Sequence, residues 1–357
     1  MSEHFEVVGL SSPGADLEEV HKNEGIRVEA IEMSRQITPV QDLISLWKVY
    51  RFLKKEKPQI VHTHTPKAGI IGMLAARLAG VPHRLHTVAG LPLMEAKGTK
   101  RKLLDFVEKR TYRCATRVYP NSRGLYDFIL QEKYTSSAKL KVIGEGSSNG
   151  IDTAYFSAEQ ISEEEKENLK RELGISKEDF VFVFVGRLVG DKGINELVSA
   201  FSELRTQNPK LLLVGPLESE LDPLKEETLQ AIQTHPNILA TGFQGDVRPY
   251  LAISDCLVFP SYREGFPNVV MQAGAMGLPS IVSDINGCNE IIQNGENGWI
   301  VPVKDANSIK TAMQRMISDR KYCLTLKQNA RKMIAERYEQ NRVWEALLEE
   351  YRKVLGI

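Results

Sequence analysis

The chain has 357 residues, and its 46 lysines and arginines are balanced by 46 aspartates and glutamates. This length predicts about two domains, and the balanced charge disfavours nucleic acid as the main partner, because nucleic-acid binding usually needs a basic excess. No apolar run approaches the ~20 residues of a membrane-spanning helix and no secretory signal opens the chain, so we expect a cytoplasmic protein. The four scattered cysteines favour reduced thiols over a disulfide framework.

Short apolar runs alternate with amphipathic segments along the whole chain. The runs predicted as strands are 5–10, 60–62, 84–86, 117–119, 140–143, 180–185, 210–214, 238–241, 256–260, 280–283 and 299–301. Helices are predicted between them, for example over 43–54, 68–78 and 102–112. Such alternation predicts an α/β fold, in which parallel sheets are wound with helices on both faces.

The alternation pauses at 144–152, a stretch rich in glycine, serine and asparagine, before a charged helix predicted over 162–173. We place a domain boundary there, which gives domains 1–150 and 151–339. A long surface loop inside a single domain is the alternative. The end of the chain, 340–357, is predicted to be a helix, because apolar residues recur at helical spacing: Val343, Trp344, Leu347, Tyr351 and Val354.

Histidines mark the strand ends of the first domain. His62 and His64 lie on one face of a predicted strand by period-two alternation, Lys67 follows them, and His86 lies in the next predicted strand. A metal site is the obvious suspicion, but no helical HExxH motif and no cysteine partner supports it, so we expect no metal. For each histidine, a packing role is the alternative to a chemical one.

The segment 91–107 mixes apolar residues with a basic cluster made of Lys97, Lys100, Arg101 and Lys102. A charge cluster is usually a solvated face. A functional alternative is contact with anionic lipid head groups or with a lipid-linked phosphate.

In the second domain, the predicted strand 180–185 ends at Gly186, which is followed by Arg187 and, five residues on, by Lys192. Both cations would lie at the carboxyl edge of a parallel sheet, where open α/β sheets bind ligands. Arginine can fork onto two phosphate oxygens and lysine supplies a point charge, so the pair suits a diphosphate. Two ordinary solvated charges are the alternative.

The stretch 261–272 places a carboxylate, a glycine and a proline where a predicted strand leads into a helix. Glu264 either accepts hydrogen bonds from sugar hydroxyls or is a helix N-terminal acid favoured by the helix dipole. The backbone N–H groups at the helix start favour anions. Phe243 follows another predicted strand, where it either packs on a base or sugar ring or belongs to the core.

Three segments together, 148–156, 186–193 and 260–270, resemble the family 4 retaining glycosyltransferases, which use nucleotide sugars. The resemblance runs from residue 5 to the C-terminus. It implies the GT-B fold, with two Rossmann-like doubly wound domains facing a cleft. The donor would bind mainly to the C-terminal half and the acceptor to the N-terminal half, and the helix 340–357 would cross back onto the first domain.

The resemblance also implies roles for single residues. Arg187 and Lys192 would neutralise the donor diphosphate, Glu264 would hold donor sugar hydroxyls, and His86 would lie beside the reacting sugar, so these four are the expected catalytic residues. His62, His64 and Lys67 would lie on the acceptor side. Where the family has a second glutamate, this chain has a glutamine, which still accepts hydrogen bonds from ribose but carries no charge. The other expected donor-binding residues are Gly186, Phe243, Gly265, Phe266, Pro267, Asn268, Val269 and Gln272.

Family members normally begin with a further strand, a glycine-containing loop and a helix. The first domain of this chain lacks that unit, so we expect a start that is shortened or assigned too late.

These features predict a cytoplasmic retaining glycosyltransferase with peripheral contact at the inner face of the membrane. It would move a sugar from a nucleotide diphosphate donor, a UDP-sugar, to a saccharide or lipid-linked acceptor in capsule or other cell-surface polysaccharide biosynthesis. The nucleotide sugar is a co-substrate, and no cofactor or essential metal is expected. The alternatives are a sugar-nucleotide epimerase of the same architecture and a truncated nucleotide-sugar-binding protein with little activity. An NAD-dependent dehydrogenase is disfavoured, because no G-x-G-x-x-G follows a predicted strand.

Overall fold

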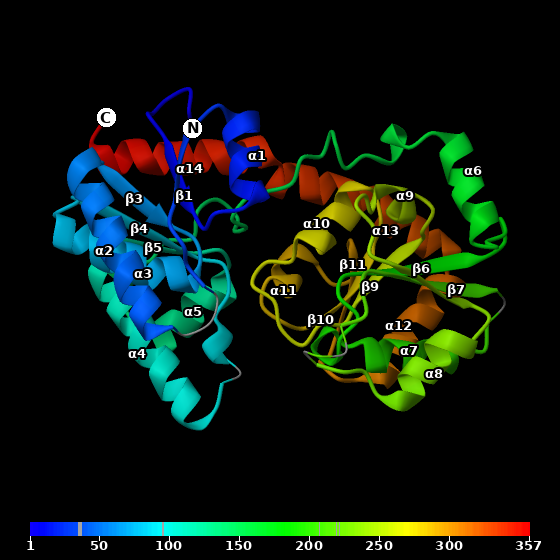
Figure 1. Cartoon of the computed structure of the whole chain (residues 1–357). Helices are drawn as coiled ribbons and strands as arrows, with labels where there is room; N and C mark the ends of the chain where they lie inside the picture. Colours follow the sequence, from blue (N-terminus) through cyan, green and yellow to red (C-terminus); the bar gives the residue numbers. More distant parts are fainter. Residues whose placement is uncertain (35–37, 95, 207, 219, 221) are drawn as a thin grey trace. The chain divides into compact units, whose positions relative to one another are not determined.

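The computed structural model describes residues 1–34, 38–94, 96–206, 208–218, 220 and 222–357. The chain divides into two compact units, which are coloured along the sequence in Figure 1. Unit 1 comprises Met1–Ser148 and Val343–Ile357, and unit 2 comprises Asn149–Arg342. Within the described ranges, no helix is both long and apolar enough to cross a membrane.

Unit 1 contains two parallel sheets. The smaller sheet pairs β1 (Val8–Ser11) with β2 (Arg27–Ala30), and the larger has the order β3 (Ile60–Thr63), β4 (His83–Val88), β5 (Arg117–Pro120). The helices are α1 (Ala15–Glu24), α2 (Pro39–Glu56), α3 (Pro66–Ala79), α4 (Gly98–Cys114), α5 (Arg123–Gln131), the 3-10 turns η1 (Pro92–Met94) and η2 (Ser137–Lys139), and α14 (Gln340–Leu355), which belongs to this unit from Val343 onward.

Two strand predictions in unit 1 need correction, and one strand was not predicted. The first strand begins at Val8 rather than at residue 5, and β2 escapes prediction because its residues are mostly exposed and include charged side chains. The segment 140–143 is not a strand. Only Leu140 forms a bridge, to Val118, and the chain then turns at Gly144, where φ is 57°.

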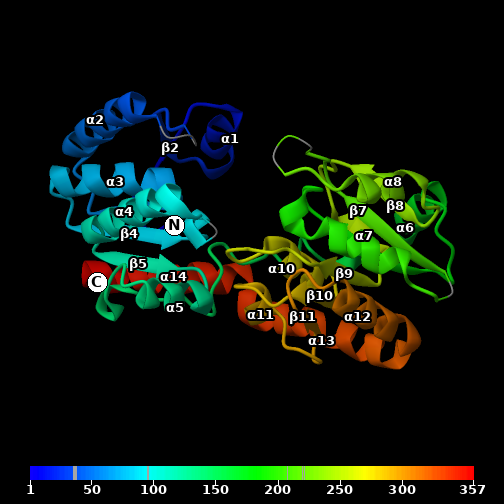
Figure 2. The same cartoon turned by 90° about the horizontal axis from the view of Figure 1, so that it is seen from below.

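Helix α3 covers the larger sheet of unit 1 and lies between α2 and α4, which appear in a row with it in Figure 2. The Thr65 hydroxyl caps its first turn, and Gly80 in the left-handed conformation ends it. Its small residues allow close packing, since a Cβ on Gly69 would lie only 2.6 Å from the imidazole of His86. The end of β4 is therefore covered by α3.

Unit 2 is built on one six-stranded parallel sheet with the order β11 (Gly298–Val301), β10 (Ser280–Ser283), β9 (Cys256–Phe259), β6 (Phe180–Val185), β7 (Pro209–Val214), β8 (Ile238–Gly242). The chain runs from β6 to β8 in one direction and then returns to the other side of β6. The strand order thus reverses between β6 and β9, which is where open α/β sheets place their ligands.

Helices alternate with these strands, as the sequence predicts. They are η3 (Ala158–Gln160), α6 (Glu163–Glu172), η4 (Gly190–Lys192), α7 (Ile194–Ser202), α8 (Glu226–Thr234), α9 (Arg248–Ala252), α10 (Asn268–Ala275), α11 (Cys288–Ile291), α12 (Ala306–Ser318) and α13 (Arg320–Tyr338). The predicted strands 180–185 and 280–283 match β6 and β10 end to end, and the other predictions in this unit differ by one residue. Continuous apolar runs identify these strands well because a parallel sheet is buried on both faces.

Candidate active site

The two cations predicted to bind phosphate follow β6 directly. Arg187 comes just after Gly186, and Lys192 ends the turn η4, after which Gly193 starts α7. Gly193 has φ +72°, and a Cβ there would lie 2.1 Å from the carbonyl oxygen of Pro260, at the end of β9. Only glycine fits this position. The close approach brings Lys192 to the loop that follows β9.

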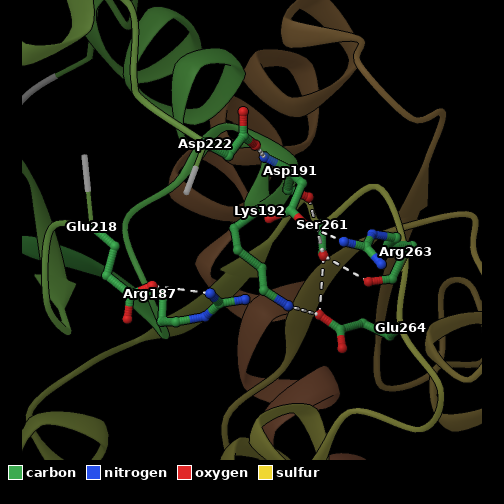
Figure 3. Close-up of polar contacts among 8 residues, drawn as sticks. All are labelled: Arg187, Asp191, Lys192, Glu218, Asp222, Ser261, Arg263 and Glu264. Atoms are coloured by element: carbon green, nitrogen blue, oxygen red, sulfur yellow. Dashed lines mark hydrogen bonds and ion pairs between the residues drawn. The ribbon is translucent and has the colours of Figure 1, made fainter. Parts of the chain in front are cut away.

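That loop carries Glu264, and Figure 3 shows its carboxylate facing Lys192. Lys192 Nζ forms an ion pair with Glu264 Oε1, and each side chain is 18% exposed. The hydroxyl of Ser261, which is fully buried, donates to the same carboxylate oxygen at 3.0 Å. Ser261 thus holds the Glu264 carboxylate in place. The lysine and the glutamate both remain partly accessible, as a ligand-binding pair must be.

A second cation–carboxylate pair lies beside the first (Figure 3). Arg187 Nη1 lies 3.0 Å from Glu218 Oε2, and the arginine side chain is 44% exposed. Glu218 follows β7, the strand next to β6. The turn between the two cations is held by Asp222, which accepts the backbone N–H of Asp191 at 2.5 Å, and by Arg263, which pairs with Asp191 at 2.9 Å. Carboxylates from both neighbouring strand ends thus surround the two cations.

The start of α10 completes the loop after β9. The Asn286 side-chain amide donates to the carbonyls of Glu264 at 3.2 Å and Gly265 at 2.6 Å, which fixes the turn. Pro267 is buried at the N-cap of α10, whereas Asn268 is exposed and Val269 and Gln272 are half-buried.

Two aromatic residues expected at the donor site have opposite environments. Phe266 is 8% exposed and its ring packs edge-on to Tyr338 at 5.3 Å, so its side chain belongs to the core. The part of Phe266 in donor binding stays a prediction. Phe243 is 76% exposed just after β8, which excludes the core alternative for it. An exposed ring at a strand end is free to pack on a ligand.

In unit 1, His86 is a core residue. It is 3% exposed, its Nδ1 lies 2.8 Å from the Thr63 hydroxyl, and Gly69 of α3 packs against its ring. Burial lowers the pKa of His86 to about 4, so the imidazole is neutral near pH 7. The burial of His86 is what the packing alternative expects, and its catalytic role stays a prediction.

The two other histidines of this group differ from each other. His62 is hydrogen bonded through Nδ1 to the Tyr351 hydroxyl at 2.6 Å and through Nε2 to the Thr87 hydroxyl at 2.8 Å. Burial and the neighbouring histidines lower the pKa of His62 well below its usual range. His64 is exposed, with its ring centre 4.3 Å from that of His62. His62 thus anchors α14 to the sheet, and His64 is the accessible one.

A pocket within unit 1 lies against these histidines, at the carboxyl ends of β3, β4 and β5. Its lining includes His62, His64, Asn121 and Ser148. Asn121 Oδ1 and Ser148 Oγ are buried there without a hydrogen-bond partner among the residues that the structure describes. Buried polar atoms of this kind are rare, and a single ordered water, for which this pocket has room, would satisfy them.

Comparison with known proteins identifies the chain. Residues 3–146 match the glycosyl transferase 4-like domain, and residues 165–333 match the glycosyl transferases group 1. The sequence is 35% identical over 348 residues to the capsular polysaccharide biosynthesis glycosyltransferase CapM of Staphylococcus aureus, covering 97% of this chain and 89% of CapM. This chain belongs to the group 1 glycosyltransferases.

A second relative and a solved structure agree with this assignment. The UDP-Gal:alpha-D-GlcNAc-diphosphoundecaprenol alpha-1,3-galactosyltransferase of Escherichia coli is 34% identical over 292 residues, covering 81% of this chain and 74% of that enzyme. Anabaena HepE, solved in complex with UDP, aligns with a TM-score of 0.81 at 20% identity, covering 97% of this chain and 92% of HepE. The expected GT-B fold and enzyme class are both confirmed.

For this glycosyltransferase, two cations expected from the sequence to bind acceptor or membrane have partners inside unit 1. Lys67 Nζ lies 2.6 Å from both carboxylate oxygens of Asp42, which joins α3 to α2. Arg101 donates to Asp105 at 2.8 Å, to Glu132 at 2.9 Å and to the Leu93 carbonyl at 2.9 Å. Arg101 is thus held by ion pairs within unit 1, and its contact with a membrane stays a prediction.

Sequence reasoning missed the residues that hold the site of this glycosyltransferase in place. Glu218 and Asp222 follow β7, and Asn286 follows β10. A signal was present for the first two, because carboxyl ends of parallel strands meet at one edge and β7 follows β6 in the chain. Their exact partners depend on loop conformations that no motif describes.

Proposed function

We propose that this glycosyltransferase moves a sugar from a UDP-sugar to a hydroxyl of a saccharide or lipid-linked acceptor, with retention at the anomeric carbon, in the biosynthesis of a cell-surface polysaccharide. The observation that carries the proposal is the contact of Lys192 with Glu264 beside Arg187, at the reversal point of the unit 2 sheet.

The positions and charges of the two cations suit a nucleoside diphosphate leaving group. Arg187 and Lys192 each hold a carboxylate, Glu218 and Glu264, and a bound diphosphate would take the place of both partners. When the bond between the anomeric carbon and the diphosphate oxygen breaks, negative charge grows on that oxygen. Prealigned cations stabilise this charge most where it develops. The two side chains supply this charge without an essential metal.

Binding of the diphosphate to Lys192 would also leave Glu264 able to bind the donor sugar. Once Lys192 turns to the diphosphate, the carboxylate, still held by Ser261, is free to accept hydrogen bonds from sugar hydroxyls. Phe243 and Gln272 would contact the nucleoside, the first by ring packing and the second through its amide oxygen. The accessible His64 of unit 1 would lie on the acceptor side.

The named relatives support the choice of substrates. HepE has been solved with UDP and with UDP-glucose, CapM is named for capsular polysaccharide biosynthesis, and the Escherichia coli relative is named for UDP-Gal and a diphosphoundecaprenol acceptor. Retention rests on the resemblance of the motifs to a retaining family. The anomeric proton signals of the product, measured by NMR, will report on it.

Thermal stabilisation by UDP and a panel of UDP-sugars tests the donor site, because a ligand that binds the native state raises its stability with concentration and affinity. We expect a shift that Glu264→Ala reduces for UDP-sugars more than for UDP. Glu336→Ala, an exposed residue on α13, is the control. Equal shifts in both variants would contradict the proposal. Turnover of a UDP-sugar without any acceptor would instead identify an epimerase.

A further inference from the structure

The loop between β7 and α8 is hydrogen bonded at two points to the loop that follows β6. The N–H of Leu188 donates to the Pro216 carbonyl at 2.8 Å. The N–H of Asp191 donates to the Asp222 carboxylate at 2.5 Å. Glu218 lies between these two points along the chain. Its place beside the loop after β6 therefore does not depend on its own carboxylate.

The carboxylate of Glu218 has one polar partner among the residues that the structure describes. Its Oε2 accepts a hydrogen bond from Arg187 Nη1 at 3.0 Å (Figure 3). The Glu264 carboxylate differs, because the buried Ser261 hydroxyl holds it in addition to Lys192. Glu218 is 31% exposed and Arg187 is 44% exposed. Rotation of either side chain can therefore open the Arg187–Glu218 pair, whereas Glu264 keeps a second partner.

Glu218 competes with any phosphate for the same guanidinium. Arginine binds a phosphate best when two of its N–H groups reach two oxygens, so a carboxylate on Nη1 makes part of this fork unavailable. A phosphate that takes the whole fork must first break the pair, and its departure lets the pair form again. The exchange costs little, because the net contribution of a partly exposed ion pair is small.

We propose that Glu218 is a placeholder for the donor diphosphate. Its carboxylate pairs with Arg187 when no donor is bound, releases the guanidinium to the diphosphate of the donor, and pairs with it again as the nucleoside diphosphate leaves. Glu218 thus lowers the affinity for this product and favours its release. The inference rests on the proposed function, because it needs a nucleoside diphosphate as the ligand of Arg187.

Isothermal titration calorimetry with UDP tests the placeholder on the full chain. Glu218→Gln removes the charge and keeps the size of the side chain, so it should lower the dissociation constant of UDP by about threefold to fivefold. The dissociation constant of uridine, which has no phosphate, should stay the same. An affinity for UDP that is equal in the variant and the wild type, or lower in the variant, would overturn the inference.

Glu203→Gln is the matched control for this variant. Glu203 is also a partly exposed carboxylate of unit 2 in an ion pair, at 2.6 Å from Lys310, and it lies outside the donor site. The same loss of charge there should leave the dissociation constant of UDP unchanged. An equal gain in both variants would mean that the total charge of the unit, and not the pair with Arg187, sets the affinity.

A double-mutant cycle shows whether Glu218 acts through Arg187. If the carboxylate competes for the guanidinium, the gain from Glu218→Gln should fall below about twofold in an Arg187→Ala background, because the group competed for is absent. A gain of about threefold or more in that background would show that Glu218 acts on the phosphate without the arginine, and would refute the placeholder.

The wild-type titration separates this inference from the proposed function. Failure of UDP to bind either the wild type or Glu218→Gln would refute both. UDP binding by both proteins, without a gain in the variant, would refute the placeholder and leave the donor site standing. Steady-state kinetics gives a second measurement, since the inhibition constant of UDP as a product should fall in Glu218→Gln by the same factor as its dissociation constant.

Discussion

The two units treat the polar residues at their strand ends in opposite ways. In unit 2, Lys192 and Glu264 follow β6 and β9 and stay partly accessible as an ion pair. In unit 1, His86 lies near the end of β4 and is 3% exposed and neutral. Both positions are of the kind at which parallel sheets bind ligands. Position in the sheet alone therefore does not decide which side chains stay accessible.

The difference comes from where a glycine lets the chain pack. At the end of β4, Gly69 of α3 presses against the imidazole and closes the strand end. At the end of β6, Gly193 lets the turn η4 approach the end of β9, so that the lysine side chain projects toward the carboxylate. Close packing at a glycine thus buries His86 in unit 1, and in unit 2 it brings Lys192 and Glu264 together.

Lys192→Ala should have the largest effect, because it removes the cation of the accessible ion pair in unit 2. Removing the cation that would face the leaving diphosphate should lower kcat/KM for sugar transfer by about 10²–10³-fold, the range seen when one prealigned electrostatic group is deleted. The exposed Lys332→Ala in the same unit should change it by less than about twofold. Steady-state kinetics with a UDP-sugar measures both. A fall smaller than about threefold in Lys192→Ala would contradict the role proposed for this residue.

Gly193→Ala tests the packing that creates the pair. At φ +72° a side chain is strained, and its Cβ would lie 2.1 Å from the Pro260 carbonyl oxygen, so unit 2 should lose about 1–3 kcal/mol or more of unfolding free energy. Gly245→Ala is the control, because a Cβ there meets nothing within 4 Å. Urea unfolding of both variants gives the comparison. Equal stabilities would mean that the glycine is not required.

The sequence predicts most of unit 2 because its strands are continuous apolar runs and its charged residues follow them directly. Arg187, Lys192 and Glu264 could be placed at one edge for this reason. Unit 1 is harder to predict. The exposed strand β2 gives no apolar run, and the burial of His86 depends on the packing of α3 against it. Long-range packing of this kind depends on helix approach, which residue patterns along the chain do not encode.

The unfolding free energy of unit 1 should depend on pH through buried side chains that are neutral in the folded state. Burial lowers the pKa of His86 to about 4 and raises that of Glu108 to about 7. The unfolded histidine takes up a proton below about pH 6.5, so its contribution to stability is lost as pH falls toward 4. The glutamate behaves in reverse, and its contribution is lost as pH rises from about 4.5 toward 7.

Glu108→Gln should therefore remove the pH dependence that opposes that of the buried histidines. Between about pH 4.5 and 6.5, the unfolding free energy of the variant should fall with acidification more steeply than that of the wild type, by about 1.4 kcal/mol per pH unit. Above about pH 7 the variant should be the more stable protein. Urea unfolding at several pH values, with hydrogen exchange of the β4 amides as the local probe, measures this. Parallel pH curves for variant and wild type would refute it.

The smallest expected effect separates two neighbouring cations of α4. Arg101 donates to Asp105 and Glu132 and is 22% exposed, whereas Lys102 is exposed on the outer face of the helix. Arg101→Ala should cost unit 1 about 1–2 kcal/mol of unfolding free energy, because partly buried carboxylates lose charged hydrogen bonds. Lys102→Ala should cost less than about 0.5 kcal/mol, because its side chain is exposed. The reverse order of the two stabilities, measured by urea unfolding, would contradict the assignment of Arg101 to ion pairs that stabilise unit 1.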